Sequence, residues 1–241
     1  MCSSDLHASE NDEESKKRLD ARLHDMDVGS EAVFVAGMAM QSLLRSLGVE
    51  PDVMMGHSSG ESAALAASGA VPAATPLELA AFVRELNAVY ERVLAEGKIA
   101  TGALLAVGAL PAEAVRARIA ATGSPAVIAM DNCANQLVLY GASDAIAALQ
   151  GVLSEAGAIC LPLPFDRGYH TADFADVSAA FHAFYGRIKL RAPKVPLYSC
   201  ASTELFPGTA VAVRKLAAAQ WSQAVRFRET DRKSTRLHSS H

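Results

Sequence analysis

One stretch restricts the fold more than any other part of the chain: residues 51–65, which read PDVMMGHSSGESAAL. Its apolar run at 53–55 predicts a buried strand, and the small residues after the second glycine predict a helix. A strand, a sharp turn and a helix around Gly-x-Ser-x-Gly form the pattern of a nucleophile elbow. Such a turn strains the backbone of Ser58, and we expect a side chain at Gly56 or Gly60 to collide across it. The stretch therefore predicts an α/β fold that presents a serine hydroxyl.

The expected turn places the Ser58 hydroxyl at the N-terminus of the helix. There the backbone N–H of Ser59 and the positive end of the helix dipole can stabilise an oxyanion. The alternative is a glycine-rich turn without chemistry, because a bare Gly-x-Ser-x-Gly often arises by chance. The strand before the turn and the helix after it favour the catalytic interpretation.

Composition narrows the class of protein. The 241 residues are 51% hydrophobic and 20% charged, which is typical of a soluble globular protein with a sizeable core. The net charge of −4 argues against nucleic acid as a partner. The four cysteines show neither metal-ligand spacing nor a disulfide framework, and no apolar run reaches the roughly 18 residues that cross a bilayer. We therefore expect a cytoplasmic protein without a metal site or a membrane partner.

A second pattern begins near residue 102. Strands and helices follow one another there in the order β-α-β-β-α-β, which is the ferredoxin-like arrangement. The expected strands lie at 103–107, 126–130, 136–140 and 158–161, and the expected helices at 111–121 and 143–156. We interpret this segment as a small subdomain inserted into a larger one.

The larger subdomain is expected to be rich in helices. The sequence predicts helices at 31–47, 76–96, 173–188 and 211–221, a strand at 195–199 and a possible strand start at 225–227. The predicted organisation is a disordered or non-native lead at 1–27, a large subdomain at 28–101 and 166–230, the small subdomain at 102–165, and a disordered or non-native tail at 231–241. The ends MCSSDL and KSTRLHSSH look like translated sequencing-adapter material.

A serine nucleophile needs a base within hydrogen-bond reach. Of the seven histidines, His170 stands at the end of an irregular loop between the two subdomains, where functional groups are commonly carried. We favour it as the general base over a loop histidine that is merely hydrogen-bonded. His182 lies among phenylalanines within a predicted helix and is interpreted as a packing residue.

A third catalytic member is less evident. Asp166 and Asp173 flank His170, but they are too near in sequence to orient its ring from behind, and a loop turn and a helix N-cap explain them better. A backbone carbonyl near Ser199–Cys200 could select the tautomer instead. The sequence thus predicts a Ser–His dyad rather than a triad.

Four motifs in order carry a family resemblance: GHSSGE at 56–61, GYH at 168–170, VPLYS at 195–199 and W…VRF at 221–227. Together they resemble the acyltransferase domain of type I polyketide and polyunsaturated-fatty-acid synthases, which is related to malonyl-CoA:acyl-carrier-protein transacylase. The resemblance covers about residues 28–230. It implies an α/β-hydrolase-like large subdomain with a ferredoxin-like insert. The chain lacks the GQGSQ-type segment and the strands beyond VRF of that family, so the resemblance implies a domain truncated at both ends.

The resemblance also implies a reaction. Ser58 would attack the thioester of an acyl-CoA, with malonyl-CoA expected, while His170 takes the proton. The phosphopantetheine thiol of an acyl carrier protein would then attack the acyl-serine ester. No bound cofactor is implied, and a ketosynthase is expected among the neighbouring synthase domains.

Three residues are implied in substrate binding: Arg84, His57 and Tyr169. The family binds the extender's carboxylate with an arginine after the elbow, and Arg84 matches it one residue further along than usual; a planar guanidinium suits a carboxylate. The alternative for Arg84 is a surface arginine beside Glu85. A bulky aromatic residue at 169 resembles the malonyl-type loop, since a ring there leaves no room for an α-methyl group, although Arg167 departs from the usual patterns.

Two other functions compete with acyl transfer. A serine hydrolase would release the acyl group to water, but Arg84 and the missing carboxylate member speak against it. A catalytically inactive acyltransferase-like docking module is disfavoured because Ser58 and His170 are both present. Since a donor to the oxyanion and core strands are missing, we expect the chain as it stands to be unstable or inactive.

Overall fold

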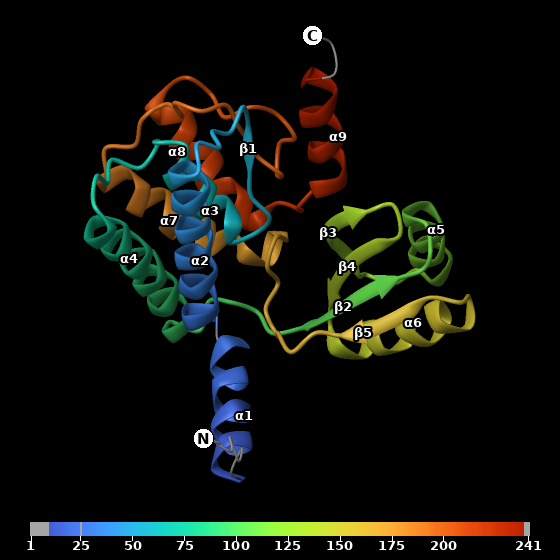
Figure 1. Cartoon of the computed structure of the whole chain (residues 1–241). Coiled ribbons are helices and arrows are strands. Elements are labelled where there is room, and N and C mark those ends of the chain that lie inside the picture. Colours follow the sequence, from blue (N-terminus) through green and yellow to red (C-terminus); the bar gives the residue numbers. More distant parts are fainter. Residues whose placement is uncertain (1–9, 25, 239–241) are drawn as a thin grey trace, which may run out of the picture.

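The structure, a computed structural model, describes residues 10–24 and 26–238. It has two parts, a helix-rich large subdomain and a small subdomain built on one sheet, which lie side by side in Figure 1. The chain leaves the large subdomain before β2 and returns to it after β5. The small subdomain is therefore an insertion, as the sequence predicts.

The small subdomain has the element order β-α-β-β-α-β. Its elements are β2 (Ala103–Gly108), α5 (Ala112–Thr122), β3 (Val127–Cys133), β4 (Gln136–Gly141), α6 (Ser143–Glu155) and β5 (Ile159–Pro162). The strands form an antiparallel sheet in the order β3-β4-β2-β5. One face of this sheet packs against α5 and α6 through a core of aliphatic side chains that includes Leu105, Leu137 and Leu149. Alternate residues of β2 and β4 point to the other face, as the period of two in a strand requires.

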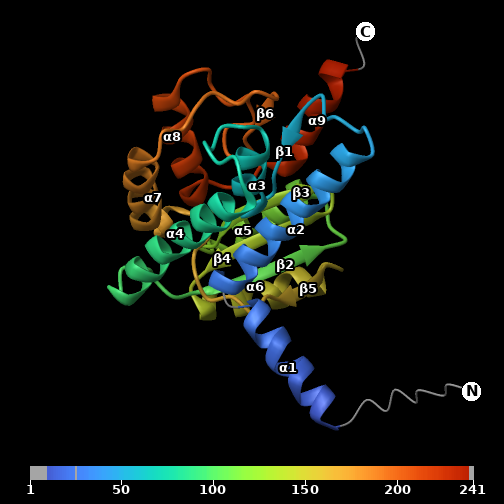
Figure 2. The same cartoon turned by 60° about the vertical axis from the view of Figure 1, so that its left-hand side comes forward.

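The large subdomain surrounds a short parallel pair of strands, β1 (Met54–Met55) and β6 (Leu197–Tyr198). Its helices are α2 (Met26–Ser46), α3 (Gly60–Ala67), α4 (Pro76–Ala95), α7 (Ala175–Arg187) and α8 (Ala210–Ala219), with short 3₁₀ helices η1 (Ala172–Phe174) and η2 (Gln220–Ser222). Figure 2 shows α2 and α4 side by side, in front of the sheet of the small subdomain. One apolar core runs from Phe82 and Phe184 to Leu104 and Val138 of the small sheet. Packing thus joins the two subdomains.

Helix α4 illustrates how local sequence sets an element. Thr75 caps its N-terminus by accepting from the N–H of Glu78, and the Glu78 carboxylate accepts from the Thr75 N–H at 2.9 Å. Pro76 occupies the first turn, where a missing N–H costs nothing. This capping box agrees with the predicted helix at 76–96.

Both chain ends differ from the sequence expectation. The described part of the 1–27 lead contains helix α1 (Glu10–His24), whose described side chains are mostly exposed, and α2 begins at Met26. Oppositely charged residues four apart, such as Glu13 and Lys17, support such a solvated helix. Residues 1–9 and 25 lie outside the described residues. The predicted disorder over 10–24 is therefore wrong.

The tail contains helix α9 (Phe227–His238). The strand expected to start at 225–227 is limited to an isolated parallel bridge between Val225 and Met130. Thr230 and Ser234 are buried, so α9 packs through small side chains rather than through the apolar pattern that sequence reasoning sought. The prediction of disorder over 231–238 is wrong, and residues 239–241 lie outside the described part.

One side of α2 stays uncovered. The apolar side chains of this helix include Met40, Leu43 and Leu44, yet these three are exposed. Together with β1 and α3, the helix lines a groove of about 570 Å³. Within residues 10–24 and 26–238, no helix is both long enough and apolar enough to span a membrane.

Candidate active site

The elbow at Ser58 has the strained geometry that its sequence predicts. Ser58 has a positive φ of 55°, between β1 and the first residue of α3. A Cβ at Gly56 would lie 2.2 Å from the carbonyl oxygen of Gly60, so only glycine fits there. A Cβ at Gly60 would meet nothing within 4 Å, so the expected collision at this second glycine is wrong. Of the two elbow glycines, only Gly56 lies so close to the backbone at the start of α3 that a side chain would collide.

The structure brings Ser58 and His170 together. Ser58 Oγ and His170 Nε2 are 2.7 Å apart, although 112 residues separate them in sequence. His170 lies in the loop after the small subdomain, is 1% exposed and also has a positive φ, of 61°. Both members of the pair are thus held in backbone conformations that a non-glycine residue rarely adopts, as is common at functional sites.

A carbonyl oxygen selects the tautomer of His170. Its Nδ1 lies 2.9 Å from the backbone oxygen of Gln220, which can only accept, so Nδ1 carries the proton and Nε2 is left to accept from Ser58. The His170 backbone N–H donates to the Trp221 carbonyl at 3.0 Å, and the two rings stack with centroids 6.0 Å apart. The two residues predicted to form a dyad are thus in contact, but the carbonyl that orients His170 belongs to η2 and not to Ser199–Cys200.

Burial keeps the imidazole in its neutral form. Loss of solvent lowers the pKa of His170 from 6.5 to about 4, with a smaller contribution from the charge of His57, and the bond to Gln220 opposes this shift. At neutral pH the ring is therefore unprotonated and can accept a proton from a serine hydroxyl.

Neither flanking aspartate orients His170. Asp166 pairs with Arg167 at 3.0 Å, and Asp173 accepts a hydrogen bond from the Tyr140 hydroxyl at 3.1 Å. Asp173 lies inside η1 and not at its N-cap position, which is Thr171. The expectation that these aspartates are not catalytic agrees with these contacts, whereas the N-cap role is wrong.

The segment Ser199–Cys200 instead holds the acidic residue of the GHSSGE motif. Glu61 is buried in α3, where its carboxyl group accepts from the Ser199 hydroxyl at 2.9 Å and from the Cys200 N–H at 3.1 Å. The Cys200 thiol donates to the Gly56 carbonyl at 3.2 Å. Burial raises the pKa of Glu61 from 4.5 to about 7, against the lowering effect of these two donors. Glu61 thus connects α3 by hydrogen bonds to the residues that follow β6.

A cavity of about 310 Å³ opens beside Ser58 at the junction of the two subdomains. Its lining is mostly apolar and comprises Gly29, Ser30, Val33, His57, Ser58, Ser59, Leu104, Met130, Leu163, Phe165 and Tyr169. The large subdomain supplies the nucleophile, while the insert and its linkers supply much of the opposite wall. A small acyl group on Ser58 fits this volume.

Two predicted binding residues, Tyr169 and His57, lie on this cavity. Tyr169 is buried, its ring packs edge-on against Phe165, and its hydroxyl lies 3.4 Å from that of Tyr90. Burial raises the pKa of Tyr169 far above its ordinary range, so it remains a neutral phenol. The ring therefore limits the cavity by its bulk.

His57 is held by a residue that sequence reasoning missed. Its Nε2 lies 2.7 Å from Oδ1 of Asn132 in β3. Asn132 lies beyond the end of the strand expected at 126–130, but β3 continues to Cys133 with irregular register at Asp131/Cys133. Such bulges re-aim side chains next to active sites, and they leave little trace in a sequence pattern.

Arg84 is not brought to the cavity. It lies on α4 with an exposed side chain, and its Nε donates to the Ala80 carbonyl at 3.3 Å. Val83 and Leu86 of the same helix are buried in the core. Position 84 lies on the side of α4 that faces solvent. The expected placement beside the substrate is therefore wrong in this structure, and the alternative of a surface arginine describes it.

Ser59 lies where an oxyanion donor is expected. The backbone bonds of the elbow begin at Gly60, whose N–H donates to the His57 carbonyl at 2.9 Å, and Glu61 N–H donates to the Ser58 carbonyl at 2.9 Å. Among the described residues, no group accepts from the Ser59 N–H. Ser59 immediately precedes α3, so its N–H lies at the N-terminal, positive end of the helix dipole.

The fold and this site define an α/β protein that carries a serine on a nucleophile elbow and pairs it with a buried loop histidine. Comparison with known proteins specifies the family further. The family described as "Acyl transferase domain" matches residues 7–239, so this chain belongs to the acyltransferase domain family and is an acyltransferase domain by class.

The similar sequences are polyketide synthases. The non-reducing polyketide synthase ZEA1 of Gibberella zeae is 30% identical over 81% of this chain, and the spectinabilin polyketide synthase system protein NorC of Streptomyces orinoci is 29% identical over 88%. The chain spans only 9% of the length of each of these two relatives.

Solved structures share the fold. A malonyl-transacylase in complex with its type II polyketide synthase acyl carrier protein has a TM-score of 0.78 at 22% identity, covering 91% of this chain and 70% of that chain. The acyltransferase domain of an iterative polyketide synthase in enediyne biosynthesis has a TM-score of 0.70 at 26% identity, covering 87% and 53%.

Proposed function

We propose that this domain moves an acyl group from coenzyme A to an acyl carrier protein through an acyl-Ser58 intermediate. The observation that carries the proposal is the 2.7 Å contact between Ser58 Oγ and an unprotonated His170 Nε2. The family membership supports the reaction class. The related transacylase in complex with its acyl carrier protein supports the nature of the acceptor.

The chemistry balances as two transfers. In the first, Ser58 Oγ attacks the thioester carbonyl while His170 Nε2 takes its proton, and the Ser59 N–H binds the developing oxyanion. The C–S bond breaks, and the coenzyme A sulfur leaves with the proton from His170. In the second, His170 removes the proton of the phosphopantetheine thiol, whose sulfur attacks the ester carbonyl. The acyl C–O bond breaks, and Ser58 Oγ leaves with the proton from His170.

A malonyl-type unit is the proposed acyl group. Two observations support it: the relatives with similar folds include malonyl-transacylases, and the Tyr169 ring narrows the cavity against an α-methyl group. Arg84 is left out of the proposed binding set because its side chain faces solvent.

The reaction would take place in the cytoplasm, with a ketosynthase among the neighbouring domains. The subdomains would correspond to an α/β-hydrolase-like unit and a ferredoxin-like unit.

Side-by-side product analysis tests the proposal. The chain is incubated with malonyl-CoA, with and without a phosphopantetheinylated acyl carrier protein, and intact-protein mass spectrometry follows the acyl group. We expect a malonyl adduct on the chain that Ser58→Ala abolishes and that the carrier protein discharges. Free malonate released at the same rate without carrier would instead identify a hydrolase. If neither an adduct nor a product forms, the inactive docking module is favoured.

A further inference from the structure

Besides the apolar core that the two subdomains share, two backbone connections join the small subdomain to the large one. The first is the pair of linkers, where Thr101 forms an antiparallel bridge with Arg167 and the Gly102 N–H donates to the Asp166 carbonyl at 2.8 Å. The two linkers run close to one another to the left of the small sheet in Figure 1, between this sheet and the large subdomain. Connections of this kind allow a subdomain to rotate unless a second contact holds it.

The second attachment lies at β3. Val225, in the segment before α9, pairs with this strand in parallel: the Asp131 N–H donates to the Val225 carbonyl at 2.7 Å, and the Val225 N–H donates to the Ala129 carbonyl at 2.9 Å. Val225 is buried. The segment between η2 and α9 thus adds a short strand-like edge to the sheet of the small subdomain.

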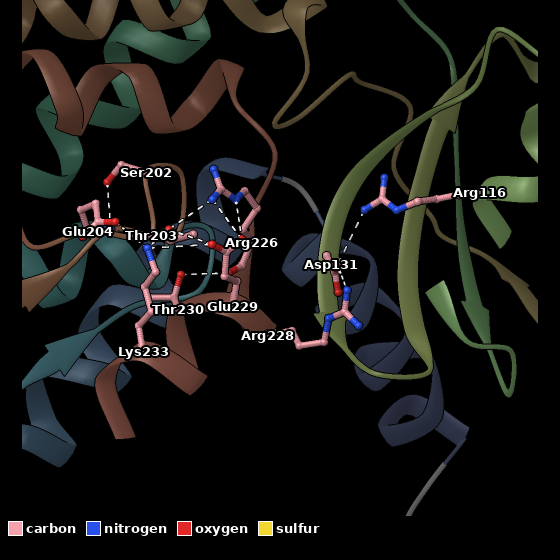
Figure 3. A network of polar contacts seen from close by, with 10 residues as sticks. All are labelled: Arg116, Asp131, Ser202, Thr203, Glu204, Arg226, Arg228, Glu229, Thr230 and Lys233. Carbon is pink, nitrogen blue, oxygen red and sulfur yellow. Dashed lines mark hydrogen bonds and ion pairs between the residues drawn. The ribbon is translucent and has the colours of Figure 1, made fainter. Parts of the chain in front are cut away.

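An ion pair accompanies this edge. Arg228 of α9 donates to Oδ2 of Asp131 at 2.6 Å, and Arg116 of α5 lies 3.8 Å from the same oxygen (Figure 3). Asp131 is 8% exposed, and among the described residues its other oxygen has no partner. A carboxylate in such a position depends on its cation, because an unpaired buried charge is costly.

The residues on either side of Asp131 belong to the active site. Met130 lines the cavity beside Ser58, and Asn132 accepts the hydrogen bond from His57. A displacement of β3 would therefore change both the width of the cavity and the position of His57.

We propose that Asp131 and Arg228 are a positioning pair that holds the small subdomain closed over Ser58. Neither side chain touches the reacting atoms. The pair acts through β3, and it sets how tightly the acyl-CoA is bound rather than how fast the acyl group reacts. The kinetic part of this proposal rests on the proposed acyl transfer, whereas the closure itself does not.

The start of α9 offers a matched control. Arg226 donates to Glu229 at 3.0 Å and to the Thr203 hydroxyl at 3.2 Å, and its backbone N–H donates to the Cys200 carbonyl at 2.8 Å. Figure 3 shows this second network on the side of α9 that faces the large subdomain, away from Asp131. Arg226→Gln therefore weakens the same helix without touching β3.

Amide hydrogen exchange tests the closure directly on the whole chain. Arg228→Gln should raise the exchange of the Asp131 and Val225 amides by about tenfold. Arg226→Gln should leave the Asp131 amide within about twofold of the parent chain. Equal protection of Asp131 in the parent and in Arg228→Gln would overturn the proposal.

Kinetics on the same proteins tests the consequence. In Arg228→Gln and in Asp131→Asn, we expect the KM for malonyl-CoA to rise about tenfold while kcat stays within about twofold, the signature of lost uniform binding. Arg228→Lys keeps the charge and should stay within about threefold of the parent KM. An equal loss of kcat in Arg226→Gln and Arg228→Gln would show a general loss of stability and contradict the positioning role. If the parent chain transfers no acyl group, the proposed function fails, while the exchange experiment still decides the closure.

Discussion

His170 donates its Nδ1 proton to the carbonyl oxygen of Gln220 across 2.9 Å, so the ring can only accept at Nε2, where Ser58 lies. A backbone oxygen performs here the orienting task that a carboxylate performs in a triad. Because the carbonyl is neutral, in the proposed reaction it would leave the charge on the imidazolium of the transition state without a full counter-charge. The dyad therefore relies on the geometry of η2.

Removal of the base should abolish rapid acylation. We expect His170→Ala to slow malonyl transfer to Ser58 by about 10²–10⁴-fold, because the serine hydroxyl loses its proton acceptor. Single-turnover acylation followed by mass spectrometry measures this rate. Asp173→Asn is the matched control, since Asp173 contacts Tyr140 and not the imidazole, and it should stay within about threefold of the parent.

The pH dependence of acylation should follow His170. Because its pKa is lowered to about 4, the rate should stay level from about pH 7 to about pH 5 and fall only as the ring becomes protonated near pH 4. An apparent pKa near the ordinary 6.5 of histidine would contradict the dry environment assigned to the ring. Short assays with a pre-equilibrated enzyme separate this effect from acid unfolding.

Stability should carry a second pH signature, from Glu61. A carboxyl pKa raised from 4.5 to about 7 adds stability at low pH, and this contribution is lost as the pH rises between these values. The lowered pKa of His170 acts in the opposite sense, since its contribution is lost as the pH falls from 6.5 to about 4. Of these two pH-dependent contributions to stability, Glu61→Gln removes that of Glu61 and keeps that of His170. Thermal denaturation should therefore show that stability increases more steeply with pH between about 4.5 and 6.5 in the variant than in the parent.

The two glycines of the elbow should respond differently to alanine. Gly56→Ala places a Cβ 2.2 Å from the Gly60 carbonyl oxygen, and we expect a loss of roughly 3 kcal/mol or more in the free energy of unfolding. Gly60→Ala meets open space at the start of α3 and should change this free energy by less than about 1 kcal/mol. Urea denaturation of both variants makes the comparison, and equal losses would contradict the geometry of the turn.

The bulk of Tyr169 should limit the acyl group. Tyr169→Ser enlarges the cavity beside Ser58, so the ratio of methylmalonyl to malonyl loading should rise several-fold, since a single methyl group is worth about 1–3 kcal/mol in a pocket. Competition between the two acyl-CoA substrates, read by mass spectrometry of the adduct, measures this ratio. An unchanged ratio would count against Tyr169 as the residue that excludes the methyl group.

Arg84 should be dispensable. Because its guanidinium lies at the surface of α4, Arg84→Gln should change the KM for malonyl-CoA by less than about twofold. A loss of tenfold or more, confined to substrates with a free carboxylate, would restore the role implied by the family resemblance. Acetyl-CoA serves as the uncharged comparison.

Some features follow from local sequence, and these agree between prediction and structure. The elbow, the helix that Pro76 opens and the β-α-β-β-α-β order of the insert arise from short patterns whose physical causes lie within a few residues. The partnership of Ser58 with His170 could also be predicted, because the loop histidine stood apart from the alternatives. The helices at the two ends were missed because neither has an apolar period: the described side chains of α1 are mostly exposed, and α9 buries the small side chains of Thr230 and Ser234.

The remaining features depend on the path of the chain in space. Gln220, Asn132 and Arg228 act through groups that lie far from their partners in sequence, and a carbonyl oxygen or an amide leaves no recognisable pattern. Whether Arg84 is exposed depends on which side of α4 faces the core. A shift of one position along a helix turns a side chain by about 100° around the helix axis. The sequence by itself determined the chemistry at Ser58, since the strained turn is a local property. Only the tertiary structure decided which distant groups orient and enclose it, since those contacts form when separate elements pack.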